Sequence, residues 1–259
     1  MTRLVRVELL KLRTMRVTYG LLAGAVAITA LFASLEASRT GRAVPPVGTA
    51  AGLSDVTTVS GVAMVLAAVL GVIVTSGEFR HTSATLTYLA TPDRRRVLGA
   101  KAVATALVGA CYGLAAGIVA TVVGLAFVAG DGDHVALGAA PLIGHIAGAA
   151  AGAALLAAMG VAIGSLFRSQ LAGVIGVFVW CMVIESILGG SVSSLRPYLP
   201  YTAATTLGGA KLGAGAFGPG YSVSNQGALP FLAAAALIAA IAIALSLLAE
   251  RTTVRHDIT

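Results

Sequence analysis

The residues best suited to catalysis or metal binding are sparse in this chain, and their spacing forms none of the common catalytic motifs. The four histidines do not combine with a glutamate as HExxH, so the helix of the zinc proteases is absent. No GxSxG nucleophile elbow occurs. None of the three lysines precedes Ser or Thr, so the chain lacks the phosphate-binding P-loop. We therefore expect no enzymatic activity, no metal site and no bound cofactor in this chain.

Two polar residues of possible functional interest fall inside long apolar runs. Glu185 lies in WCMVIESILGG, and acids within apolar segments are functional candidates because a charge in hydrocarbon is costly. Glu185 is also four residues from the expected end of its segment, so its carboxylate could instead reach interfacial water. The two interpretations, a substrate pathway and an interfacial position, stay open here. For His145, near the end of another apolar run, we favour an interfacial position.

Composition indicates an integral membrane protein. Only 10% of the 259 residues are charged, against about 25% in soluble domains, and the mean hydropathy is +0.94. Apolar runs of this length cross a hydrocarbon core about 30 Å thick as helices. The predicted fold is an all-α bundle of six transmembrane helices forming a single transmembrane domain over 1–259. The six segments are 17–35, 55–76, 102–129, 141–166, 171–189 and 229–249.

The basic residues indicate how the chain is oriented. Segments 1–16, 77–101, 167–170 and 250–259 hold 13 of the 17 Lys and Arg residues. The positive-inside rule then predicts that both termini are cytoplasmic. The same placement explains the net charge of +7 by contact with anionic membrane lipids, and not with nucleic acid. The basic leader 1–16 could lie at the membrane surface, although its helical wheel shows no clean apolar face. The outer loop 190–228 is expected to contain short helices or a re-entrant segment.

Glycines recur on a four-residue spacing in the fourth apolar segment. Such ridges of small residues let helix backbones approach closely inside a membrane. We expect this ridge to pack tightly against another helix, with a homodimer seam as the less favoured alternative. The ridge consists of Gly144, Gly148, Gly152, Gly160 and Gly164.

Charge is concentrated in one short cytoplasmic stretch, GEFRHTSATLTYLATPDRRRVLGAK, residues 77–101. It holds seven of the chain's 27 Asp, Glu, Lys and Arg residues. Thr82 or Ser83 could begin a short helix, and Pro92 would end it. Phe79, Ser83, Leu86 and Ala90 would then share one face. This pattern predicts an amphipathic helix parallel to the membrane that docks a protein partner. The simpler alternative, a loop that only sets topology, explains the arginines but not the helix.

The same stretch resembles the first cytoplasmic loop of ABC-2 type permeases, the membrane subunits of bacterial ABC exporters. That family shows a Gly-Glu-aromatic-Arg start, a Thr-rich amphipathic segment, a Pro followed by basic residues, and a Lys opening the next span. Each feature occurs here. The six spans, the basic leader and the long loop before the last span are also similar to the family.

The resemblance implies a mechanism and a set of partners. A dimer, formed with a second copy or a paralogue, would bind two copies of a separate ATPase subunit that holds ATP and Mg. Residues 80–90 would be the coupling helix in a groove of the ATPase. Glu78 would pair with a basic group, Arg80 would contact the ATPase or a lipid phosphate, and Leu86, Tyr88 and Leu89 would be apolar anchors. The implied docking set is Glu78, Phe79, Arg80, Leu86, Tyr88, Leu89, Pro92 and Arg94.

Two other classes of protein are alternatives to a permease. A secondary transporter or channel would need no ATPase, but such proteins usually carry several intramembrane charges or broken helices in both halves. A membrane enzyme, or an immunity or assembly factor, is the weakest alternative because no catalytic constellation is present. The expected location is the cytoplasmic membrane of a bacterium. The sequence does not indicate the substrate.

Overall fold

The computed structural model describes residues 1–39, 45–80, 94–167, 169–210 and 228–252, and in these ranges it contains helices and no strand. The first helices are α1 (Thr2–Thr14), α2 (Arg16–Ala37), α3 (Ala50–Thr57) and α4 (Gly61–Arg80). Two long helices follow, α6 (Arg94–Gly130) and α7 (Ala139–Leu166). The remainder comprises α8 (Gln170–Val179), the π-helix η1 (Trp180–Ile184), α9 (Glu185–Ser191), the 3₁₀ helix η2 (Ser193–Tyr198), α10 (Pro200–Leu207) and α11 (Phe231–Thr252).

Six helical segments are long and apolar enough to cross a membrane, which confirms the expected number of spans. The third differs most from its predicted bounds, because helix α6 begins at Arg94 and not near residue 102. The span Arg95–Gly130 has 36 residues, about 54 Å of helix at 1.5 Å per residue. This exceeds a hydrocarbon core of about 30 Å. The basic first turns of α6 therefore extend beyond the length needed to span the core.

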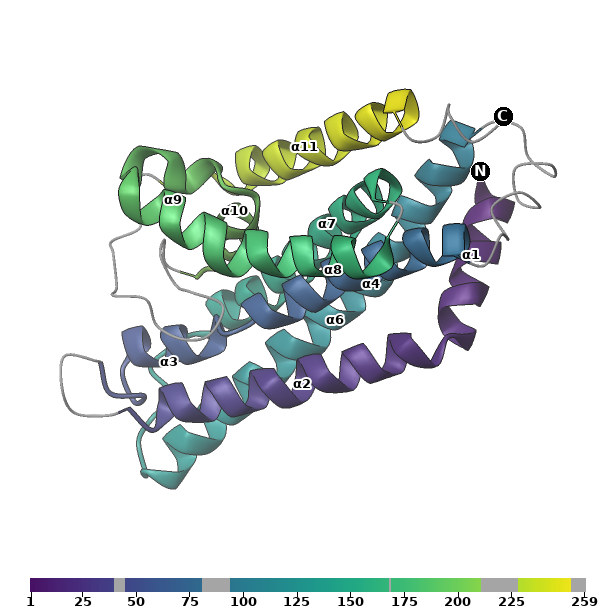
Figure 1. The fold of residues 1–259 in the computed structure, drawn as a ribbon. Helices are drawn as coiled ribbons and strands as arrows, with labels where there is room; N and C mark the ends of the chain where they lie inside the picture. The colour runs from purple at the N-terminus through teal and green to yellow at the C-terminus, as the bar shows by residue number, and fades with distance from the viewer. Residues whose placement is uncertain (40–44, 81–93, 168, 211–227, 253–259) are drawn as a thin grey trace.

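The spans alternate in direction along the bundle, and the short helices divide between its ends (Figure 1). At one end lie α1, the end of α4, the start of α6 and the end of α11. We call this the basic end, because its helix termini carry most of the described arginines. At the opposite end lie α3, α9 and α10. Helix α1 turns sharply away from α2 at Met15, whose extended backbone separates the two helices.

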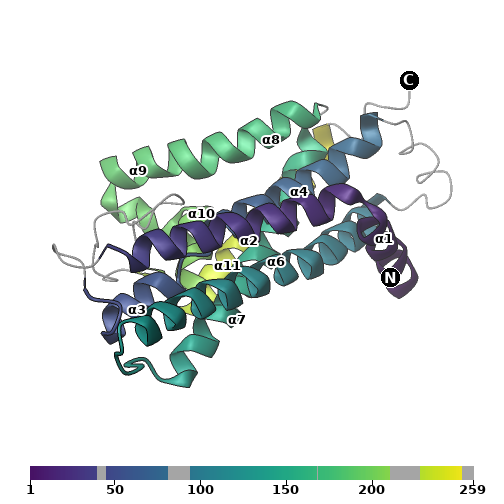
Figure 2. The same ribbon diagram turned by 90° about the horizontal axis from the view of Figure 1, so that it is seen from below.

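Helix α4 forms the centre of the bundle. In the most apolar stretch of this span, 78% of the residues are buried. The corresponding share is 22% in α2 and 11% in α11. Residues 62–70 are all buried, and α4 packs against α2, α6, α7 and α8 (Figure 2). A helix that is apolar on every side belongs inside a bundle. The outer helices instead expose their apolar side chains, as helices in contact with lipid do.

The glycines of α7 lie where neighbouring backbones come closest. A methyl group at Gly160 would collide with the carbonyl oxygen of Ala68 in α4, and one at Gly164 would lie 2.8 Å from the carbonyl oxygen of Val72. The other half of the ridge faces α10. A methyl group at Gly148 would collide with the carbonyl oxygen of Leu207, and one at Gly152 would lie 2.6 Å from that of Ala204. Gly144 has open space around it, so four of the five ridge glycines contact helices of the same chain.

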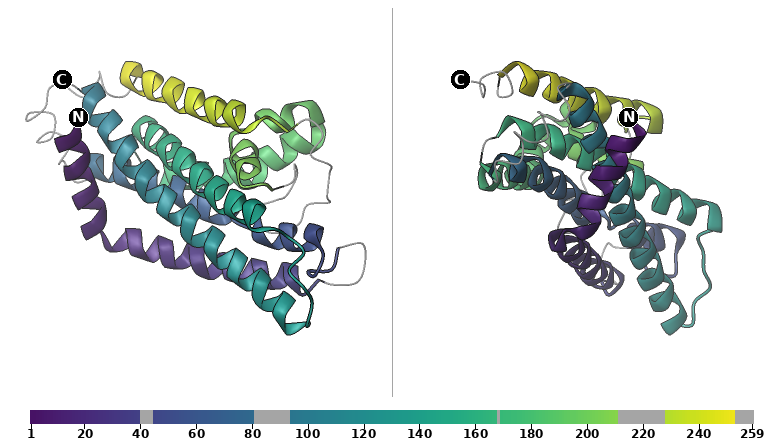
Figure 3. Two further views of the ribbon diagram at one scale, coloured as in Figure 1. Left: turned by 180° about the vertical axis from the view of Figure 1, so that it is seen from behind. Right: turned by 90° about the vertical axis from the view of Figure 1, so that its right-hand side faces the viewer.

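Two short helices follow α9 in the described part of the 190–228 segment. The first, η2, is joined to α9 by the Arg196 side chain, whose Nε donates to the carbonyl oxygen of Gly189 at 3.1 Å. The second, α10, lies between α7 and α11 (Figure 3). Its residues Ala203, Ala204 and Leu207 are buried. The two helices close the opposite end of the bundle.

Candidate functional site

Only part of the predicted docking set falls within the described residues, and that part lies at the basic end. Glu78, Phe79 and Arg80 belong to the last turn of α4, and Arg94 is the first residue of α6. Leu86, Tyr88, Leu89 and Pro92 lie outside the described residues, as does the expected amphipathic helix. The charged loop therefore joins the most buried helix of the bundle to its longest one.

A buried ion pair fastens the start of α6 to the N-terminal helix. Lys101 in α6 is 2% exposed and Glu8 in α1 is 5% exposed. The Lys101 Nζ atom lies 3.4 Å from Glu8 Oε2, and Lys11 Nζ lies 2.9 Å from Glu8 Oε1. Buried charges need paired, hydrogen-bonded partners, and each carboxylate oxygen of Glu8 has one. The pair fixes α1 across the basic end, about two helical turns after Arg94, the first residue of α6.

An apolar face of α1 surrounds this pair. Val5, Leu9 and Leu12 pack into the main hydrophobic core, and Leu12 is 1% exposed. Together with Glu8, these positions follow the spacing of one helix face. The leader is therefore a packed helix with an apolar face that includes one paired acid.

The second cluster of polar groups surrounds Glu185 at the opposite end. The Glu185 side chain is buried, with an exposed fraction of 3%. Its Oε1 accepts hydrogen bonds from Trp180 Nε1 at 2.9 Å and from the backbone N–H of Tyr201 at 2.8 Å. Its Oε2 accepts from the backbone N–H of Thr202 at 2.9 Å and from Thr202 Oγ1 at 3.1 Å. Each carboxylate oxygen therefore has two donors, all from the protein.

The Glu185 side chain caps the N-terminus of α10, because the residue at the N-cap position has no side chain that could do so. Leu199 occupies the N-cap position and has no polar side chain, and Pro200 begins the helix. A proline there has no N–H to satisfy, but the next two backbone donors, those of Tyr201 and Thr202, need acceptors. The Glu185 carboxylate, which belongs to α9, supplies an acceptor oxygen to each of these two N–H groups. The ionised carboxylate would also face the positive end of the helix dipole.

The π-helix η1 immediately precedes Glu185. The backbone N–H of Glu185 donates to the carbonyl oxygen of Trp180 across the wider turn, and the Trp180 indole donates to the Glu185 carboxylate. A π-helical turn inserts an extra residue into a helix and is frequent at functional sites. Trp180 and Glu185, five positions apart in the sequence, lie at the two ends of this wider turn, where the indole reaches the carboxylate. The Glu185 carboxylate is buried among protein donors in this arrangement, and both a role in a substrate pathway and an interfacial position stay predictions.

Tyr201 adds a buried hydroxyl beside this cluster. It is 4% exposed, and its Oη atom has no hydrogen-bond partner among the described residues. Burial raises the pKa of Tyr201, and the neighbouring Cys181 and Glu185 act in the same direction. A methyl group at Gly61 would collide with the Tyr201 hydroxyl. The ring therefore fills the space beside the first residue of α4.

His145 lies away from the Glu185 carboxylate, in a contact between α7 and α3. Its Nδ1 is 2.8 Å from Thr57 Oγ1, and its side chain is partly buried. Gly209, with a φ of +84°, brings the chain after α10 against the His145 ring. Within the described ranges, no group of three His, Cys, Asp or Glu residues is placed to hold a metal ion.

Sequence reasoning missed Glu8 and the partners of Glu185. Glu8 interrupts the apolar face of α1, which hid the amphipathic pattern. For Glu185, the available signal was the Leu-Pro start of α10, because a helix that begins without a capping side chain needs an acceptor from elsewhere. No sequence signal indicated that this acceptor would come from the span before it.

No protein-family model matches this chain, and no curated protein matches it.

Proposed function

We propose that this chain is the transmembrane permease subunit of an ATP-driven exporter in the cytoplasmic membrane of a bacterium. The proposal rests on the resemblance of the 77–101 stretch to the coupling loop of ABC-2 type permeases. The six apolar spans support it. The chain carries no P-loop, so ATP and Mg would be bound by two copies of a separate ATPase subunit. A second permease, as a copy or a paralogue, would complete the transporter.

The observation that carries the mechanism is the position of the charged loop between α4 and α6. Helix α4 is the most buried span of the bundle, and α4 and α6 both pack against α7. A force applied to the loop by a closing ATPase would therefore act directly on the core of the bundle. The paired Glu8 and Lys101 would hold α1 and α6 together as one rigid lever. In this mechanism Leu86, Tyr88 and Leu89 anchor the loop in the ATPase, and the spans tilt between inward- and outward-facing states.

The test is the capture of the partner from native membranes. The tagged chain is purified in mild detergent, and co-purifying proteins are identified by mass spectrometry. We expect a stoichiometric ATPase that is lost from Leu86→Asp, because a charge at an apolar anchor cannot enter the groove without losing its hydration. Thr87→Asp is the matched control, since it adds the same charge to the neighbouring position. Absence of an ATPase from the wild-type chain under several mild conditions would contradict the proposal.

A secondary transporter is the alternative function, and Glu185 is the observation that could favour it. Buried intramembrane acids often carry protons or substrates in such proteins. The four donors around Glu185 are all protein groups, and three of them belong to Tyr201 and Thr202 of α10, which supports a positioning role. Transport by purified chain in liposomes without ATP would favour the alternative.

A further inference from the structure

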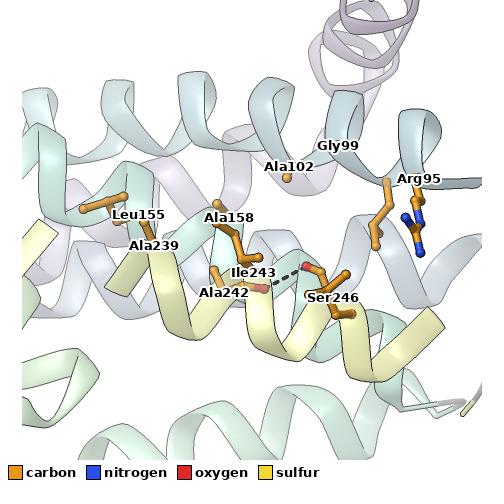
Figure 4. Close-up of a pocket in the computed structure, with 11 residues that line it drawn as sticks. Arg95, Gly99, Ala102, Leu155, Ala158, Ala239, Ala242, Ile243 and Ser246 are labelled. Carbon is orange, nitrogen blue, oxygen red and sulfur yellow. Dashed lines mark hydrogen bonds between the residues drawn. The ribbon is translucent and has the colours of Figure 1, made fainter. Parts of the chain in front are cut away.

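A groove at the basic end separates α11 from α6. Both helices pack against α7, and the groove between them has a volume of about 310 Å³, near the lower limit of roughly 300–1,000 Å³ for small-ligand sites. Figure 4 shows Leu155 and Ala239 toward one end of the groove and Arg95 at the other. The groove is partly open at the protein surface, on an apolar part of helices that are long and apolar enough to cross a membrane.

Small side chains on all three helices leave this space open. Larger apolar side chains form the walls, among them Leu155 from α7 and Ile243 from α11. The Ser246 hydroxyl donates to the carbonyl oxygen of Ala242 in its own helix at 2.8 Å, so it is not a polar anchor for a ligand. The small lining residues are Gly99, Ala102, Ala158, Ala239 and Ala242.

The length and the charge of the groove suit one kind of molecule. Along α11 the lining runs from Ala239 to Leu247, about 12 Å of helix, which is close to half of a hydrocarbon core about 30 Å thick. One acyl chain of a single leaflet has this reach. At the basic end the lining includes the exposed Arg95, and the exposed Arg251 follows Leu247 by one helical turn. Arginine matches the geometry of phosphate oxygens.

We propose that the groove between α6, α7 and α11 binds one anionic phospholipid, with an acyl chain along Ala158 and Ala242 and its phosphate on Arg95. The lipid comes from the leaflet at the basic end of the bundle. It fills the space between α6 and α11 and stabilises the position of α11. This site is independent of the proposed transport function, because it requires only that the bundle lies in a membrane.

The test uses native mass spectrometry of the full chain in neutral detergent. Phosphatidylglycerol and phosphatidylcholine with identical acyl chains are added in equal amounts, and the lipid that survives collisional activation is identified. A basic residue near an anionic surface contributes about 1 kcal/mol, so we expect roughly fivefold more phosphatidylglycerol than phosphatidylcholine on the wild-type chain. Arg95→Gln should reduce this ratio to about one. Arg3→Gln, which removes a charge from an exposed position of α1, should preserve it.

A second pair of variants tests the acyl-chain position. Ala242→Phe fills the groove and should abolish retention of both lipids, whereas Ala244→Phe places the same ring on the exposed side of α11 and should not. Equal retention by these two variants, or an unchanged lipid ratio in Arg95→Gln, would overturn the proposal. So would palmitate retained as well as phosphatidylglycerol with the same dependence on Arg95, which would assign the groove to a free fatty acid. If Ala242→Phe misfolds, Arg95→Gln still decides the outcome because it removes the charge at an exposed position of α6 and adds no bulk to the groove.

Discussion

Lys101 and Glu8 are 93 positions apart in the chain, yet their charged atoms lie 3.4 Å apart with less than a tenth of either side chain exposed. The pair joins the N-terminal helix to the basic start of the longest span. Desolvation makes a buried ion pair a poor source of net stability, but removing one member leaves an uncompensated charge. The contact therefore acts chiefly to specify one position of α1 on α6.

We expect Lys101→Met to destabilise the protein by about 3 kcal/mol, at the lower end of the cost of breaking a buried pair. The lower end applies because Lys11 still contacts Glu8 at 2.9 Å. The double variant Glu8→Leu with Lys101→Met should recover most of the loss, since an apolar replacement removes both buried charges. The measurement is the thermal unfolding midpoint in detergent, followed by circular dichroism.

Lys11→Met is the control for this prediction. The Lys11 side chain is 41% exposed, and exposed ion pairs contribute about 0–1 kcal/mol. The thermal unfolding midpoint of Lys11→Met should therefore stay close to that of the wild type. Equal midpoints for Lys11→Met and Lys101→Met would mean that the pair with Lys101 does not hold α1 in place.

The ridge of α7 supports a second prediction, because its glycines differ in what surrounds them. Gly160→Ala should destabilise the bundle by about 1–3 kcal/mol, the usual cost of overpacking, since the added methyl meets backbone of α4 that cannot rotate away. Gly144→Ala should be neutral or stabilise by up to about 1 kcal/mol through helix propensity alone, because its surroundings are open. Thermal midpoints of the two variants measure the difference.

The same two variants test where the ridge packs. If Gly144→Ala were the more destabilising, the free part of the ridge would be covered by another molecule. If neither changed the midpoint, the close approach of α7 to α4 would be wrong.

Sequence patterns predicted the spans because hydrophobicity over about 20 residues is a local property. The start of α6 was harder to predict than its end. Its first turns carry three consecutive arginines, which a search for apolar segments excludes. The helix continues through them because Val97 and Ala100 are buried and Lys101 is paired. Tertiary contacts, not local hydropathy, set that boundary.

Glu8 and Glu185 are buried acids that could not be assigned from sequence because their partners are distant. The leader showed no clean apolar face because Glu8 interrupts that face, and its partner Lys101 lies 93 positions later. Glu185 looked like a pathway or interfacial acid, yet its acceptor oxygens are occupied by donors 16 and 17 positions later. A single sequence does not indicate which residues, far apart in the chain, come into contact in the fold.

Glu185 gives the third prediction, and Trp180 provides its probe. Trp180 is the only tryptophan of the chain, and its indole N–H donates to Glu185 Oε1. Glu185→Ala should shift the fluorescence emission maximum by several nanometres and lower stability by about 3 kcal/mol or more, because each buried donor left without an acceptor costs about 1–3 kcal/mol. Glu185→Gln should have an intermediate effect, since its amide retains one acceptor oxygen.

Ser186→Ala is the matched control for Glu185→Ala. Its exposed hydroxyl donates only to the Met182 carbonyl of the same helix, so its loss should leave both the Trp180 emission and the unfolding midpoint unchanged. Limited proteolysis gives an independent measure, because an uncapped α10 should be cleaved faster around Tyr201 in Glu185→Ala than in Ser186→Ala. Identical emission spectra and cleavage rates in the two variants would show that Glu185 does not hold α10, and its carboxylate would then be available for a role in transport.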